Sequence, residues 1–200
     1  MTRKTDARAN AIAAAIRLFR MQGYTATGLT QILEESGAPK GSFYFHFPRG
    51  KVQLAEEAID HYVAARMAVL GEISAATTGD ALRFVHRLFD AFADEMIQSD
   101  FQYGCLMQNL ANELPSLDPA LTARVARGFV DSTAIVAAHF EGCGLAAAQA
   151  SSTAAALVAA LEGARTIARL ERTPAVFRAL ADVSAQRWAA AAAETSAQRG

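Results

Sequence analysis

Apolar residues recur at helical spacing along almost the whole chain, and the strict alternation typical of strands is absent from the sequence. This pattern predicts an all-α fold. Near the N-terminus it predicts one helix from about Asp6 to Gln22, ended by Gly23, and a second helix from about Leu29 to Ser36. Gly37 then supplies the turn before a third, short helix that begins near Pro39, because proline suits the start of a helix.

Six further helices complete the predicted fold. They cover about residues 51–70, 80–98, 104–114, 118–142, 145–170 and 173–193. Two of them open with a capping residue followed by proline, at Asp118–Pro119 and Thr173–Pro174. Residues 142–161 contain no charge, but Gln149 and the hydroxyl residues beside it predict a buried, alanine-rich helix instead of a membrane span. We therefore expect no membrane partner.

The charges divide the chain at about residue 51. Residues 1–51 carry eight lysines and arginines against three acidic residues, a net charge of +5, whereas the remainder has a net charge of −6. All three lysines lie in the basic part. A basic head on an acidic body indicates a polyanion partner for the head alone.

The head concentrates five consecutive rings, at residues 43–47, between flanking lysines. On a helix, Phe43 and Phe47 share one face, which we expect to be buried, whereas Lys40 and Tyr44 point outward. Two helices joined by a glycine turn and packed on a first helix form a helix-turn-helix, whose second helix enters the major groove of DNA. The simpler alternative, aromatic packing beside solvated charges, leaves unexplained why the charge division and the helix geometry agree.

The candidate DNA contacts lie on the second and third helices and at the start of the fourth. We expect base edges to be reached by Lys40, Ser42 and Gln31, and phosphates to be contacted by Tyr44, His46 and Lys51. Lys51 has a second reason to bind phosphate, because it opens a helix whose N-terminal amides favour an anion.

The run GYTATGLTQILEESGAPKGSFYFHFPRGKVQLAEEAI resembles the N-terminal domain of TetR-family transcriptional regulators, and its GLTQILEESGAPKGS…HFP.GK phrasing is similar to the LmrA- and YxaF-like branch. The match covers about Thr5 to Tyr62. The resemblance implies a homodimeric, cytoplasmic repressor that binds a palindromic operator in double-stranded DNA and releases it when a small-molecule effector binds. It also implies two domains, residues 1–50 for DNA binding and residues 51–200 for effector binding and dimerisation.

By position, the resemblance places Tyr44, His46 and Lys51 at phosphate contacts and Lys40 at the start of the recognition helix. Thr27 and Gly28 match the start of the second helix. Gly28 stands where the family usually has a capping serine or threonine, so we expect the cap to come from Thr27 or from water.

An effector pocket is expected among polar residues set between apolar ones in the middle helices. The candidates are His86, Phe89, Phe92, Cys105, Gln108, Asn109, Asn112, His139 and Arg165. Taken singly, each is more often an ordinary core residue than a ligand contact. The sequence has no cluster of cysteine, histidine and aspartate at metal-ligand spacing, so we expect no metal and no other cofactor.

Cys105 is the candidate for a reactive, effector-sensing thiol. It follows Gly104 at the predicted start of a helix, where the N-terminal dipole favours a thiolate. The effector would then be an electrophile or an oxidant; otherwise we expect an apolar compound and a Cys105 that is simply a small buried hydrophobe. Cys143, in a predicted turn between two glycines, lacks the helix-start position. Two cysteines in a chain of 200 residues indicate a reducing cytoplasm.

The last two long helices are rich in small residues, which allow two copies to form a four-helix bundle. These residues are Ala154, Ala155, Ala156, Ala159, Ala160, Gly163 and Ala164, together with Ala189–Ala193. Packing of the same face within one chain is the alternative. Two other functions compete with the repressor: a cysteine-dependent enzyme that pairs Cys105 with His86 or His139, and a structural DNA-binding protein without an effector. We expect no enzymatic activity, because nothing else in the chain would support catalysis.

Overall fold

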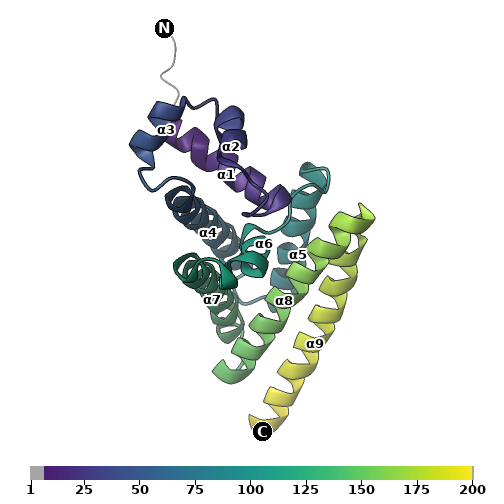
Figure 1. The fold of residues 1–200 in the computed structure, drawn as a ribbon. Helices are drawn as coiled ribbons and strands as arrows, with labels where there is room; N and C mark the ends of the chain where they lie inside the picture. Colours follow the sequence, from purple (N-terminus) through teal and green to yellow (C-terminus); the bar gives the residue numbers. More distant parts are fainter. Residues whose placement is uncertain (1–6, 200) are drawn as a thin grey trace. The chain divides into compact units, whose positions relative to one another are not determined.

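The structure is a computed structural model that describes the backbone of residues 7–199 and the side chains of residues 7–187. Over residues 7–199 it is helical without strands, which confirms the all-α fold (Figure 1). The helices are α1 (Ala7–Gln22), α2 (Leu29–Ser36), α3 (Lys40–His46), α4 (Lys51–Ala76), α5 (Ala81–Gln98), α6 (Leu106–Glu113), the 3₁₀ helix η1 (Leu114–Ser116), α7 (Pro119–Gly142), α8 (Ala147–Glu171) and α9 (Ala175–Arg199).

Helix boundaries follow the predicted start and stop signals, with three differences. Helix α4 continues through Gly71 to Ala76, because one glycine costs a helix only about 1 kcal/mol and the packing of a long helix outweighs it. Helix α9 also extends beyond its predicted end. Helix α6 begins at Leu106 instead of near Gly104, with Cys105 as its N-cap residue.

The chain forms two compact units. The first comprises residues up to 65 together with residues 104–128, and the second comprises residues 66–103 together with residues 129 onward. Helices α1, α2, α3 and α6 belong to the first unit, α5, α8 and α9 to the second, and α4 and α7 pass from one to the other. Helix α6 therefore belongs to the same compact unit as the predicted DNA-binding head. The functional division at residues 50 and 51 stays a prediction.

The core of the first unit is built on the apolar face of α1. Its large buried side chains include Ile12, Leu18, Phe19, Ile32, Phe43, Phe47, Leu54 and Ile59, and α6 adds Leu106, Met107 and Leu110. Each of α2 and α3 contributes through one main anchor, Ile32 and Phe43 respectively, because helices this short expose most of their surface. The first unit is thus a small helical cluster in which burying a few aromatic and branched side chains sets the position of α3.

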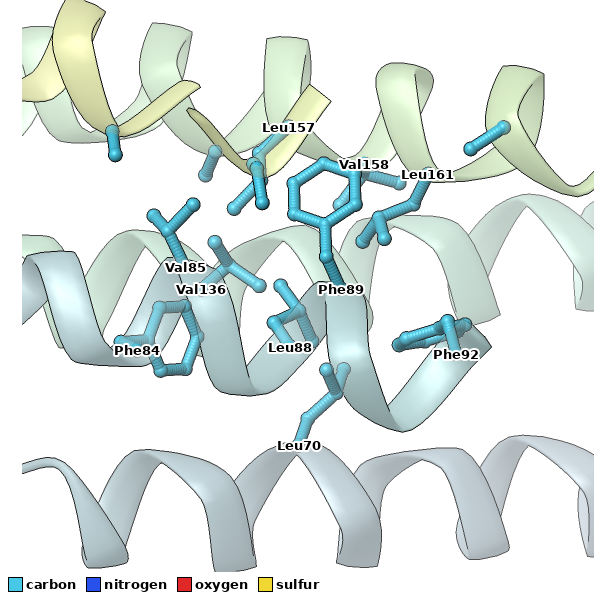
Figure 2. Packing of buried hydrophobic residues seen from close by; sticks show 14 of the residues in the cluster. Leu70, Phe84, Val85, Leu88, Phe89, Phe92, Val136, Leu157, Val158 and Leu161 are labelled. Atoms are coloured by element: carbon cyan, nitrogen blue, oxygen red, sulfur yellow. The ribbon is translucent and has the colours of Figure 1, made fainter. Parts of the chain in front are cut away.

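The core of the second unit lies between α5, α8 and α9, with contributions from α4 and α7. Figure 2 shows Val85, Leu88 and Phe89 of α5 pointing toward Leu157 and Leu161 of α8. The apolar residues that recur at helical spacing along α5 are all buried and form one continuous face; they are Val85, Leu88, Phe89, Phe92 and Met96.

Helix α8 is buried on one face only, so the predicted buried, alanine-rich helix is confirmed in part. Residues 143–146 form the turn before it, with Gly144 at φ +98°, between the two helices that the sequence predicted. On α8 itself, Ala154 and Leu157 are buried, whereas Ala155, Ala156 and Ala159 are exposed. No helix in residues 7–199 combines the length and apolar character needed to cross a bilayer.

Candidate nucleic-acid interface

Helices α2 and α3 form the predicted helix-turn-helix. Gly37 ends α2 in the left-handed conformation, at φ +64°, and its amide donates a hydrogen bond to the carbonyl of Glu34. Glycine adopts this conformation without the steric penalty that a side chain brings. Pro39 is the N-cap residue of α3, just before its first turn, and its carbonyl accepts the amide hydrogen of Phe43 at 2.9 Å.

The buried face of α3 consists of Phe43 and Phe47, as predicted. Both side chains are buried, and their ring centroids lie 5.1 Å apart. Tyr44 meets Phe43 edge to face at 5.4 Å. These contacts fix the rotation of α3 about its own axis, because turning the helix would expose two phenylalanine rings to water.

The opposite face of α3 is exposed and carries Lys40, Gly41, Tyr44 and Phe45. The side chain of Tyr44 is 44% exposed, and that of Phe45 is 82% exposed. Sequence reasoning missed Phe45 as a candidate contact, because the cluster of aromatic residues suggested a core. Its helical position holds the signal: Phe45 lies two residues from both Phe43 and Phe47, so it cannot share their face.

Three other predicted contacts lie at the edges of this surface. Ser42 and His46 are half-buried, and the His46 ring meets Phe45 edge to face at 5.2 Å. The carbonyl of His46 accepts a hydrogen bond from the Gln53 amide at 3.2 Å. The Gln31 side chain on α2 accepts a hydrogen bond from Gln22 at 2.8 Å, in solvent. None of these three side chains is fully buried, and their contact with DNA stays a prediction.

The start of α2 differs from the expectation. Thr27 is fully buried, and its hydroxyl donates to the carbonyl of Gly23 at 2.6 Å, so it does not cap α2. Gly28 is the N-cap residue and has no side-chain hydrogen bond to offer. The turn between α1 and α2 brings the Thr27 hydroxyl next to the carbonyl of Gly23, so this hydroxyl stabilises the turn and not the start of α2. A direct DNA contact by its side chain is therefore ruled out in this conformation.

Lys51 holds the loop before α2 to the start of α4. Its Nζ donates to the carbonyl of Tyr24 at 2.6 Å and lies 4.0 Å from the centroid of the Tyr24 ring. Partial burial lowers the pKa of Lys51, while the negative charge of Glu113 opposes that shift. An ammonium group has three N–H donors, so the bond to Tyr24 leaves capacity for a phosphate oxygen.

Several cations of the head are paired with acidic residues. Arg8 pairs with Glu57 at 2.8 Å, Arg49 forms a two-pronged pair with Glu56, and Arg17 pairs with Glu35. The first compact unit contains ten lysines and arginines and eight aspartates and glutamates, a net charge of +2. The count over residues 1–51 therefore overstated the positive charge of the folded head, because acidic residues at the start of α4 lie within the same unit.

Helix α6 clamps the turn between α1 and α2. The Glu113 carboxylate accepts the amide hydrogen of Tyr24 at 3.1 Å and that of Thr25 at 2.6 Å. Gly23 stands directly beneath this carboxylate, at φ +84°, where an added Cβ would lie 1.9 Å from Glu113 Oε1. The sequence contains no local signal for this interaction, because Glu113 lies almost ninety positions away from the turn it holds.

The same helix also caps the C-terminus of α1. Asn109 Nδ2 donates to the carbonyls of Phe19 and Arg20, at 3.0 Å each. Arg20 Nε in turn donates to the carbonyl of Gly104 at 2.9 Å. Asn109 was predicted to line an effector pocket. In the structure its side-chain amide caps α1 instead, because the last carbonyls of a helix lack partners within the helix.

The other predicted pocket residues divide between the two units. In the first unit, Cys105 is fully buried, Gln108 is half-buried and Asn112 is exposed. In the second unit, His86 is exposed and Phe89 is buried in the core. Their role in binding an effector stays a prediction.

Phe92 and Arg165 belong to a buried charged cluster, here called the Phe92 cluster, which comprises Arg66, Phe92, Glu95, Glu162 and Arg165. Arg66 Nη2 lies 2.9 Å from Glu162 Oε1, and Arg165 Nη2 lies 2.6 Å from Glu95 Oε2. The two guanidinium carbons lie 5.1 and 4.5 Å from the centroid of the Phe92 ring. Two arginines thus surround one aromatic ring inside the second unit.

The second unit also contains a surface hollow of about 270 Å³. Its walls come from α5, α7, α8 and α9 and include Val85, Phe140, Ala156, Val183 and Arg187. None of the predicted pocket residues lines it. Because Ala156 and Val183 are exposed, the hollow opens on the outer surface of α8 and α9.

A helix-turn-helix whose second helix turns a cation and a tyrosine outward defines a DNA-binding protein. Residues 11–58 match the family described as bacterial regulatory proteins, tetR family, and residues 81–183 match the one described as transcriptional regulator LmrA/YxaF-like, C-terminal domain. The chain belongs to the TetR family of DNA-binding transcriptional regulators, within its LmrA/YxaF-like branch.

Individual relatives agree with this assignment. The transcriptional regulator LmrA of Bacillus subtilis is 62% identical over 55 residues, which cover 28% of this chain and 29% of LmrA. The uncharacterized regulator YxaF of the same organism is 32% identical over 163 residues, 82% of this chain and 85% of YxaF.

Solved structures show the same fold. The regulatory protein TetR from Rhodobacter sphaeroides superimposes with a TM-score of 0.83 at 25% identity, covering 90% of this chain and 97% of that one. A cysteine mutant of the TetR-family regulator CifR, solved in complex with 26-bp operator DNA, has a TM-score of 0.76 at 21% identity, covering 94% of this chain and 99% of that one.

Proposed function

We propose that the protein is a homodimeric, cytoplasmic repressor that binds a palindromic operator through α3 and leaves it when a small-molecule effector binds. The observation that carries the DNA-binding part is the division of α3 into two faces. Phe43 and Phe47 anchor one face in the core, and the other presents Lys40, Tyr44 and Phe45 to solvent. Phenylalanine exposed to this extent on a recognition helix suits apolar contact with a thymine methyl group.

The assignment of base and phosphate contacts predicts different effects for two lysines. Lys51→Ala is expected to weaken binding to all DNA sequences and to lower the salt dependence by about one unit for each phosphate that a subunit no longer neutralises. Lys40→Ala should instead relax sequence preference, because Lys40 points outward from the first turn of α3. Operator selection followed by salt titration measures both. Unchanged affinity and slope in Lys51→Ala would contradict the phosphate role.

No contact within the protein explains why position 41 of α3 is glycine. A Cβ added there would meet nothing within 4 Å, although glycine destabilises a helix by about 1 kcal/mol relative to alanine. We infer that the DNA backbone approaches α3 closely at this point. Gly41→Ala is therefore expected to raise the melting temperature and to weaken operator binding at least tenfold, about 1.4 kcal/mol.

Gly71→Ala in α4 is the matched control for this substitution. It also adds a methyl group to a helical glycine with open space around it, but in the second unit. It should stabilise the protein and leave operator affinity unchanged. Full operator affinity in Gly41→Ala would show that the space at Gly41 is not used by DNA.

The proposal of a homodimer is supported by the outer face of α8. Ser152, Ala155, Ala159, Gly163 and Thr166 are exposed on it and carry no charge. The charged residues in the middle of the helix, Glu162 and Arg165, point inward instead and are buried. A small-residue, uncharged face beside α9 suits close packing against a second copy. A dimer that reads a palindromic operator would need its two α3 helices about 34–36 Å apart. The hollow on this surface would then lie at the subunit interface. The contribution predicted for Ala189–Ala193 lies outside the described side chains.

Ala159→Glu is expected to split the dimer. Two-fold symmetry would bring the two new carboxylates near each other in an apolar interface, and the dimer dissociation constant should rise by about a hundredfold or more. Sedimentation equilibrium measures the change. Ala68→Glu, at an exposed alanine of α4, controls for the added charge. A fully dimeric Ala159→Glu protein would place the interface elsewhere.

The effector site is proposed to include the Phe92 cluster. Buried ion pairs cost desolvation energy and add little net stability. Their presence in an apolar core therefore suits a binding site in which a charged group of the ligand replaces one side chain of a pair. Phe92 and Arg165 were both candidates from the sequence. The test is a screen of small carboxylates, amines and aromatic compounds for release of the operator. A releasing compound should act on the wild type and fail on Arg165→Gln. Equal release from both would exclude this site.

A further inference from the structure

A thiol and an imidazole lie in contact at the C-terminal end of α7. Cys143 Sγ is 3.6 Å from His139 Nε2, since residues four apart share one face of a helix. On the other side of the ring, His139 Nδ1 is 3.0 Å from Ser74 Oγ on α4. Cys143 is partly exposed, whereas Cys105 is fully buried. All three residues of the Ser74–His139–Cys143 chain belong to the second compact unit.

The imidazole is held in one orientation. Its ring stacks on Phe84 with centroids 3.9 Å apart and an angle of 18° between the planes. With the ring proton on Nδ1 and donated to Ser74, the lone pair of Nε2 faces the thiol. Cys143 is thus the nucleophile, His139 the base beside it, and Ser74 the hydroxyl that orients the base. Enzymes that activate a thiol or hydroxyl use the same arrangement.

The resting state of the pair is neutral. Burial lowers the pKa of His139 and raises the pKa of Cys143. A hydrogen bond to the backbone of Asp80, and then the charge of the Asp80 carboxylate, oppose burial and raise the pKa of His139. The same carboxylate adds to the raised pKa of Cys143, and a backbone hydrogen bond from Gly79 lowers it. The thiol therefore keeps its proton until an electrophile arrives, and His139 is free to accept it.

We propose that Cys143 is a covalent modification site for small electrophiles of the Michael-acceptor class, with His139 as the base. Sγ forms a bond to the β-carbon of the α,β-unsaturated carbonyl compound while the thiol proton passes to Nε2. The electrons of the carbon–carbon double bond move toward the carbonyl oxygen, and the enolate then takes the proton at the α-carbon. No group leaves and no oxidant is consumed. This site does not depend on the proposed mode of DNA binding.

The structure reverses the expected order of reactivity of the two cysteines. Cys105 occupies the N-cap position of α6, but its side chain is fully enclosed, so a reagent cannot reach it in the folded protein. Cys143 lacks a helix N-terminus but has both access and a base. Because the chain contains only these two cysteines, the position of a single adduct identifies the reactive one.

The test uses N-ethylmaleimide, a small Michael acceptor, on the full chain with intact-mass and peptide analysis. We expect one rapid adduct on Cys143, none in Cys143→Ser over the same period, and an unchanged rate in Cys105→Ser. His139→Gln should slow the reaction about tenfold or more while circular dichroism stays native. Modification of Cys105 first in native protein, or equal rates in wild type and folded His139→Gln, would overturn the proposal.

The wild-type protein provides a second measurement that needs no variant. A reaction through a preformed thiolate accelerates about tenfold per pH unit below the thiol pKa. Transfer to neutral His139 should instead give a nearly constant rate between about pH 7 and 8, because both partners keep their protonation states there. A tenfold rise across that interval would show that His139 takes no part, even if the His139 variant proved unstable.

Discussion

Gly23→Ala is expected to destabilise the DNA-binding unit by about 3–5 kcal/mol and to abolish operator binding at physiological temperature. Two effects add. Alanine resists the left-handed conformation of this position, at φ +84°, and its Cβ would displace the Glu113 carboxylate. The amides of Tyr24 and Thr25 would then lose their shared acceptor. Urea unfolding followed by operator titration measures both consequences.

Gly37→Ala separates the two effects. Gly37 lies in the same unit with a similar positive φ of +64°, but a Cβ there meets no atom within 4 Å. It should cost only the backbone strain, about 1–2 kcal/mol. Glu113→Gln should reproduce the remaining part of the Gly23→Ala destabilisation, because an amide can accept only one of the two hydrogen bonds well. Equal destabilisation in Gly23→Ala and Gly37→Ala would show that the α6 clamp contributes nothing.

Arg66→Leu is expected to lower the free energy of unfolding by about 3–5 kcal/mol, because it leaves the Glu162 carboxylate buried without its ion-pair partner. Both side chains are almost fully enclosed in the second unit, so water cannot replace the guanidinium. The substitution also removes the cation–π interaction with Phe92. Chemical denaturation monitored by circular dichroism gives the difference.

The double variant Arg66→Leu with Glu162→Leu should recover most of that stability, since an apolar pair of similar volume avoids the cost of burying charge. Arg172→Leu is the matched control: its ion pair with Asp100 is exposed, and removing it should cost less than about 1 kcal/mol. If the double variant were as unstable as Arg66→Leu, packing around Phe92 and not the unpaired charge would be the cause.

The helices and the exposed face of α3 were largely predictable. The spacing of apolar residues located α1, α2, α5 and α7 closely, because each helix buries one continuous stripe. The glycine turn and the positions of Phe43 and Phe47 predicted which side of α3 faces outward. Periodicity was less informative for α8, whose alanines fit a buried and an exposed face equally well.

Long-range polar interactions were not predictable. The cap of α2 was expected from Thr27 or from water, and Asn109 was expected to line a pocket. Instead, Thr27 donates to the carbonyl of Gly23, just after α1, and Asn109 donates to the last carbonyls of α1. The pairing of His139 with Cys143 was available from their spacing of four residues, but its orientation by Ser74 was not. A polar side chain carries no periodic signal for its partner, so several partners fit the same sequence until the backbone is placed.

Sequence patterns alone predicted the all-helical fold, the N-terminal helix-turn-helix and the resemblance to TetR regulators. Those conclusions depend on local spacing and turn residues, which act within a few positions of one another. The folded structure was needed to show that Glu113 of α6 holds the turn that leads into α2 and that Asn109 caps the end of α1. It was also needed to show that Cys143 is partly exposed and in contact with an imidazole, whereas Cys105 is enclosed. Burial and hydrogen-bond partners between distant segments depend on how the helices pack, and packing is a property of the whole fold.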